Sequence, residues 1–111
     1  MKNQSRNWRP PTDVYESDDH IIIKVEIAGM SQENFEITFY KNVLSISGCR
    51  TDENSSIRSF HQLEIGYGEF LSTIEINIPI QVDQAEAIYN NGFLILMLPK
   101  AKPKSIKIKE Q

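Results

Sequence analysis

Hydrophobic and polar residues alternate along most of this chain, and such alternation is typical of half-buried β-strands. The clearest run lies at 21–27, where one face would carry Ile21, Ile23, Val25 and Ile27. A shorter strand is expected at 13–17, joined to the long one by a turn at Asp18-Asp19. Ala28-Gly29 then interrupts the pattern. The N-terminal quarter of the chain therefore predicts two successive strands.

The rest of the chain predicts more strands and tight turns. Strand patterns lie at 35–40, 43–47, 70–78, 87–89 and 93–98, with Phe70, Ile74, Ile76 and Ile78 expected on one face. Lys41-Asn42 is a candidate two-residue hairpin, and Asn90-Asn91-Gly92 contains the Asn-Gly pair that suits a type I′ turn. Residues 82–86 allow one helical turn at most. Since no segment keeps a helical period, we predict an all-β protein, an immunoglobulin-like β-sandwich of two antiparallel sheets.

A long excursion at 49–68 does not fit a minimal sandwich, because loops of this length are usually functional or disordered. Its first part, 51–56, is polar, whereas 57–63 could form a strand. A strand at the tip of a long loop can pair with an exposed sheet edge on a second copy of the chain. The loop therefore predicts a homodimer.

The C-terminal segment predicts further assembly. Pro99 ends the last strand, and a Lys- and Pro-containing tether then leads to Ile106 and Ile108. In an extended chain these two side chains point the same way and have nothing local to bury against. A groove on another subunit is the favoured partner, although Ile106-Lys107-Ile108 could instead be a final strand on its own sheet. The tail lysines could bind RNA or lipid, but no aromatic residues interleave with them.

Length and charge narrow the class of protein. The chain has 111 residues, which predicts one domain, and a net charge of −3, which gives no argument for nucleic acid as a partner. No apolar run approaches the roughly 20 residues that span a bilayer, and the N-terminus shows no apolar signal segment. These features predict a soluble, cytoplasmic protein without a membrane span.

The residues offer no pattern for catalysis, metal binding or a cofactor. Cys49 is the only cysteine, and it is better read as a strand-end thiol than as a nucleophile. His20 lies beside two aspartates but lacks further ligands at metal-site spacing, and His61 has no nucleophile pattern near it. No Gly-rich phosphate loop is present. We therefore do not expect the protein to be an enzyme. Trp8 has two open interpretations, since it could anchor the N-terminal arm in a groove or lie on the surface.

An ordered set of motifs resembles the small heat-shock proteins of the bacterial and plant type, which are built around an α-crystallin domain. The matching segments lie at 11–19, 25–30, 44–48, 60–70, 91–100 and 106–108, and the stretch from the first to the last of them covers about nine tenths of the chain. They include Leu44-Ser45-Ile46-Ser47-Gly48, Tyr67-Gly68-Glu69-Phe70 and the terminal I-x-I motif. The resemblance implies an N-terminal arm at 1–10, a sandwich at 11–100 and a flexible C-terminal extension at 101–111.

Four departures from the family pattern stand out. Leu71 and Ser72 follow Phe70 where the family often has an Arg, and Ala28 stands where Pro is common. The strand that normally ends in Leu-Pro reads Ile76-Asn77-Ile78-Pro79. The arm before Pro10 is brief, so we expect the tail to carry most of any assembly larger than a dimer.

The resemblance also implies a function, an ATP-independent holdase that binds partly unfolded client proteins and prevents their aggregation. Ile106 and Ile108 would occupy a groove between the strands at 35–40 and 87–89, with candidate lining residues Ile37, Phe39, Val82 and Ile88. In the dimer, Arg58, Ser59, Phe60 and His61 would pair with the partner's edge at Val14, Tyr15 and Glu16. The alternative is a module like the p23 co-chaperones that recognises a folded partner, but the I-x-I motif and the strand-bearing loop argue against it.

Overall fold

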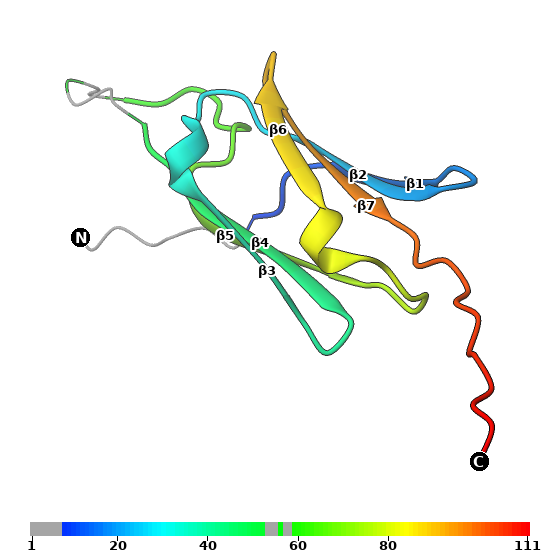
Figure 1. Ribbon diagram of the computed structural model, residues 1–111. Coiled ribbons are helices and arrows are strands. Elements are labelled where there is room, and N and C mark those ends of the chain that lie inside the picture. The colour runs from blue at the N-terminus through cyan, green and yellow to red at the C-terminus, as the bar shows by residue number, and fades with distance from the viewer. Residues whose placement is uncertain (1–7, 53–55, 57–58) are drawn as a thin grey trace.

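The computed structural model describes residues 8–52, 56 and 59–111 of the chain. In this part, the strands form two antiparallel sheets that pack face to face (Figure 1). The four-stranded sheet has the order β1-β2-β7-β6, with β1 at Thr12–Glu16, β2 at His20–Glu26, β7 at Phe93–Pro99 and β6 at Glu86–Asn90. The three-stranded sheet has the order β3-β4-β5, with β3 at Phe35–Tyr40, β4 at Val43–Arg50 and β5 at Gly68–Glu75. The predicted all-β sandwich is confirmed.

The hydrophobic core lies between the two sheets and follows the alternation of the sequence. In β2 and β7 every second residue is buried, because one face of each strand turns inward and the other outward. The buried hydrophobic residues are Ile21, Ile23, Val25, Ile27, Leu44, Ile46, Phe70, Ile76, Leu94, Leu96 and Leu98. The predicted inward face of residues 21–27 is confirmed.

One polar side chain lies inside this core. Ser72 on β5 is 0% exposed, and its hydroxyl has no hydrogen-bond partner in the part of the chain that the structure describes. Its strand partner is the buried Ile46, so the hydroxyl faces an apolar interior.

Two hairpin turns have the left-handed backbone that two-residue turns require. Lys41 and Asn42 have φ values of 50° and 67°, and they join β3 to β4 as predicted. Asn91 and Gly92, with φ values of 54° and 81°, join β6 to β7. Positive φ at both positions is the type I′ signature, which confirms the predicted turn type. Asn90 belongs to β6, however, rather than to the turn.

Two strand boundaries differ from the prediction. β4 continues through Cys49 to Arg50, because all of its residues pair with β5. β5 runs over Gly68–Glu75 and ends before Ile76, whose N–H donates to the carbonyl of Asn42 in the neighbouring turn. Ile76 stays buried and Ile78 packs against the core, so the predicted face is right although the strand is shorter. The predicted single helical turn is a 3-10 turn, η2, at Val82–Gln84.

The excursion between β4 and β5 contains no strand among its described residues, 51, 52, 56 and 59–67. Part of the predicted strand, residues 57 and 58, lies outside the described residues. The dimer that the sequence predicted from this loop stays a prediction. The tail at 101–111 belongs to no strand and runs away from both sheets (Figure 1), so the alternative of a final strand on its own sheet is not adopted.

Candidate functional site

An apolar pocket of about 230 Å³ opens between the two sheets where β3 faces η2 and the start of β6. Ile37 and Phe39 form the wall on β3, and Val82 stands opposite on η2. Leu44, Leu96 and Leu98 lie at its base. The pocket exists because β3 and β6 are edge strands of different sheets, so no backbone ladder joins them. The structure thus brings together three of the four residues that the sequence predicted for a groove.

Ile88, the fourth predicted residue, does not line the pocket. It pairs with Ile95, and it is 57% exposed on the outer face of the sheet. Its neighbour Ala87 pairs with the buried Leu96 and lines the pocket instead. Alternate residues of a strand point to opposite faces, so Ala87 and Ile88 cannot both face the pocket.

Aromatic side chains close one end of the gap between β3 and β6. The rings of Phe35 and Tyr89 lie 5.2 Å apart between centroids. The Tyr89 hydroxyl donates to the carbonyl of Ile27 at 2.8 Å and accepts from the backbone N–H of Met30 at 3.3 Å. These contacts hold β6 against the core at this end. The open, apolar part of the gap is therefore confined to the region around η2.

The tail is tied down at its root by backbone hydrogen bonds and an ion pair. The backbone N–H groups of Lys100 and Ala101 donate to the carbonyls of Asp19 and Pro79, at 2.8 and 2.9 Å. The Lys100 ammonium also lies 2.6 Å from a carboxylate oxygen of Glu16. Beyond this anchor Ile106 is 91% exposed and Ile108 is 95% exposed. Two large apolar side chains are thus displayed at the end of an anchored tether.

The first strand leaves one sheet edge unpaired. β1 pairs with β2 only, and Val14, Tyr15 and Glu16 on it are all exposed. The loop residues Ser59, Phe60 and His61 are exposed as well, and Arg58 lies outside the described residues. The described single chain does not bring the loop and this edge together.

A cluster around Trp8 was not predicted, although the sequence left open whether Trp8 anchors the arm. Trp8 is half buried, its ring meets the edge of Phe70 at 5.4 Å, and its indole N–H donates to the carbonyl of Gly68 at 3.3 Å. The guanidinium of Arg50 covers the indole at 4.6 Å and donates to the carbonyls of Gly66 and Ala28. The contact between Trp8 and Gly66 leaves no space for a side chain at Gly66. Trp8 is therefore anchored against the core rather than lying free on the surface.

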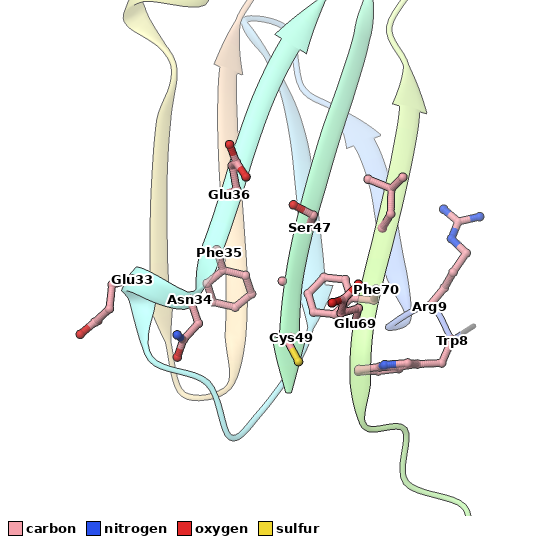
Figure 2. Close-up of a pocket in the computed structure, with 12 residues that line it drawn as sticks. Trp8, Arg9, Glu33, Asn34, Phe35, Glu36, Ser47, Cys49, Glu69 and Phe70 are labelled. Atoms are coloured by element: carbon pink, nitrogen blue, oxygen red, sulfur yellow. The ribbon is translucent and has the colours of Figure 1, made fainter. Parts of the chain in front are cut away.

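A second and larger hollow, of about 960 Å³, lies beside this cluster (Figure 2). It spans the ends of β3, β4 and β5, with Glu33 on one side and Trp8 and Arg9 on the other (Figure 2). Gly48 lies between them on β4, where an added Cβ would come within 3.0 Å of the Phe70 ring. We refer to this hollow as the Trp8 pocket.

Comparisons with known proteins identify the family. The model of the Hsp20/alpha crystallin family matches residues 13–111. The "Probable 15 kDa heat shock protein" of Leptospira interrogans is 29% identical over 107 residues, which cover 96% of this chain and 82% of that protein. "Heat shock protein 16" of Schizosaccharomyces pombe is 33% identical over 101 residues, which cover 88% of this chain and 71% of that protein.

Solved structures show the same architecture. Heat shock protein 16.0 from Schizosaccharomyces pombe superposes with a TM-score of 0.77 at 32% identity, covering 93% of this chain and 100% of that one. A small heat-shock protein from Xylella fastidiosa, described as having a distinct high order structure, gives a TM-score of 0.78 at 26% identity. That match covers 95% of this chain and 100% of that one.

The chain belongs to the Hsp20/alpha crystallin family, the small heat-shock proteins, which are a class of molecular chaperone. Its sandwich is the α-crystallin domain that the sequence motifs predicted. In the described residues no helix is long and apolar enough to cross a membrane.

Proposed function

We propose that this protein is an ATP-independent holdase that binds partly unfolded proteins and prevents their aggregation, working as dimers and larger homo-oligomers. The observation that carries the proposal is that the same chain displays two exposed isoleucines and an open apolar pocket. The tail displays Ile106 and Ile108, and the gap between β3 and β6 offers an apolar pocket with Ile37, Phe39 and Val82 in its walls. A tail from one chain in the pocket of another would shield both surfaces and link the subunits.

The energetics suit a contact that opens reversibly. Burying one Ile side chain fully contributes about 1.5–3 kcal/mol. Two give roughly 3–6 kcal/mol before the cost of ordering the tether, which takes a sizeable share. One contact is therefore weak, but several in one assembly act together through high effective concentration. Such an assembly holds together at rest and still exposes its apolar pockets when single tails leave.

The dimer would use the long loop. In the described part of the chain, the outer edge of β1 along Val14, Tyr15 and Glu16 pairs with no other strand, and residues 58–61 of a partner would add a strand there. Exposed Phe60, Leu63 and Ile65 supply apolar side chains on the same loop. Removing residues 55–62 should give monomers in sedimentation velocity, and a dimer that survives the deletion would show that another edge is used.

The holdase activity is tested by following the turbidity of a heat-labile enzyme. The expected result is suppression of aggregation at near-stoichiometric amounts, equal with and without ATP. An inert protein at the same mass concentration is the control for crowding. No suppression at any temperature up to the unfolding of the chaperone itself would contradict the proposal. A cytoplasmic location and the absence of a cofactor stay predictions from the sequence.

A further inference from the structure

We propose that the Trp8 pocket binds extended polypeptide segments in which two basic residues lie four positions apart with an apolar residue midway between them. The pocket is separate from the gap between β3 and η2, because it lies across the other end of the three-stranded sheet. That such segments belong to client proteins rests on the proposed holdase function, but peptide binding itself does not.

The charges around the pocket favour a positively charged ligand. Glu33, Glu36 and Glu69 line it, against a single cation, Arg9. All three carboxylates are exposed, and none makes an ion pair with a residue that the structure describes. Carboxylates grouped in this way and left without partners attract lysine and arginine side chains.

Apolar surface lies among these carboxylates. Leu71 is 59% exposed on the outer face of β5, and the half-buried rings of Trp8 and Phe35 border the pocket on either side. Trp8 is held as a wall by Arg50 and by its fit against Gly66. An apolar side chain that enters here is removed from water without any movement of the core.

The strand register sets the spacing of the ligand. Glu36 lies in one row with Ser47 and Leu71, whereas Glu69 lies two residues further along β5, beside Cys49. With strands 4.7–4.9 Å apart and about 3.4 Å per residue, the two glutamates are on the order of 12 Å apart. An extended chain covers that distance in three to four residues. Alternate residues of an extended chain share a face, so two basic residues four positions apart, with an apolar residue midway between them, match Glu36, Glu69 and the neighbouring Leu71.

The test uses the fluorescence of Trp8, which is the only tryptophan of the chain. The full chain is titrated with the blocked peptide Ser-Lys-Ser-Leu-Ser-Lys-Ser and with a matched peptide carrying Glu in place of both Lys. One exposed ion pair changes affinity by about 1.4- to 5-fold, so the Lys peptide should bind about tenfold more tightly. The difference should shrink at about 1 M salt, where the screening length is about 3 Å. Equal affinity for the two peptides, or no saturable signal from either, would overturn the proposal.

Matched variants locate the site. Glu36→Gln combined with Glu69→Gln should weaken the Lys peptide about fivefold. Glu75→Gln combined with Glu86→Gln removes the same charge outside the pocket, since Glu86 lies at the β3–η2 gap, and it should change nothing. If the control pair lowers the affinity for the Lys peptide more than Glu36→Gln with Glu69→Gln does, the peptide binds elsewhere and the proposal is wrong.

Chemical blocking gives a test that does not depend on a variant folding. Cys49 is exposed in the pocket and is the only cysteine, so a bulky maleimide can be attached to the folded protein. Calorimetry should then show no binding of the Lys peptide, whereas Cys49→Ser protein treated with the same reagent should bind normally. Unchanged binding after full modification would overturn the proposal. If the protein suppresses aggregation but binds neither peptide, the proposed peptide site is wrong and the holdase function is unaffected.

Discussion

Arg50 lies over the indole ring of Trp8, with its guanidinium carbon 4.6 Å from the ring centroid. The same guanidinium donates to the carbonyl of Gly66 at 2.6 and 2.9 Å and to the carbonyl of Ala28 at 2.9 Å. One side chain thus joins three segments: the arm, the return of the long loop and the end of β2. The base of the predicted dimerisation loop is held by the residue that also fixes the wall of the Trp8 pocket.

Arg50→Ala should loosen all three segments. We expect a loss of about 1–3 kcal/mol in the free energy of unfolding, because charged hydrogen bonds and a cation–π contact disappear together. Trp8 emission should shift to the red as its ring becomes exposed. Urea unfolding followed by circular dichroism measures the first effect. Lys24→Ala, which removes a cation 4.5 Å from the Phe93 ring, is the control and should cost less free energy of unfolding. Equal costs for the two variants would mean that the backbone hydrogen bonds of Arg50 contribute nothing.

Gly66→Ala should displace the Trp8 ring from its contact with residue 66. A Cβ at this position would lie 2.5 Å from two atoms of the indole, which is closer than any real contact. The expected cost is about 1–3 kcal/mol in the free energy of unfolding. In a Trp8→Ala background the same change should cost less than about 0.5 kcal/mol, because the clash is gone. Additive costs in this double-mutant cycle would contradict the packing of the two residues.

Ser72→Ala should stabilise the fold. The buried hydroxyl of Ser72 has no partner among the described residues, so its removal relieves a desolvation cost. We expect a gain of about 1 kcal/mol and a melting temperature higher by about 4 °C. Ser45→Ala, on the outer face of the neighbouring strand, should stay within about 0.5 kcal/mol of the parent. A loss of stability in Ser72→Ala would reveal that the hydroxyl makes a useful contact.

The two hairpin turns should respond in opposite directions. Asn42 has a φ of 67°, so Asn42→Gly should relieve left-handed strain and raise the free energy of unfolding by about 0.5–1 kcal/mol. Gly92→Ala should lower it by about 1–2 kcal/mol, since φ is 81° and the new Cβ would lie 3.2 Å from that of Ala28. Thermal unfolding by calorimetry compares both with the parent. The same sign for both changes would contradict the turn assignment.

The sequence predicted the parts of this fold that depend on local pattern. Alternation placed the inward face of residues 21–27 correctly, and Asn91-Gly92 predicted its turn type, because strand period and left-handed φ are set by neighbouring residues. Ile88 was placed on the wrong face for a physical reason. Both faces of β7 are apolar, with Ile95 on one side and Leu96 on the other, so the sequence alone did not show which residues of β6 point inward.

Contacts between segments that lie far apart in the chain could not be predicted from the sequence. Trp8 meets Gly66 and Phe70 across some sixty residues, and nothing in the local pattern announces that contact. The early end of β5 is similar, because it depends on a hydrogen bond from Ile76 to the turn at Asn42. The groove residues Ile37 and Val82 came from family resemblance rather than from periodicity, and the structure brings them to one pocket.

The tail should carry the assembly beyond the dimer. Ile106→Ala combined with Ile108→Ala removes most of the apolar surface that the proposed contact buries, and we expect particles to shrink toward dimers. Lys107→Ala is the matched control, because in an extended tail Lys107 points away from the face that carries both isoleucines. Its particles should keep the parent mass.

Native mass spectrometry of the parent, the double Ile variant and the Lys107 control, at matched concentrations, tests the central claim that the tails link subunits. The account predicts that only the double Ile variant loses the larger species, with its dimer retained. An unchanged mass distribution in that variant would contradict the claim.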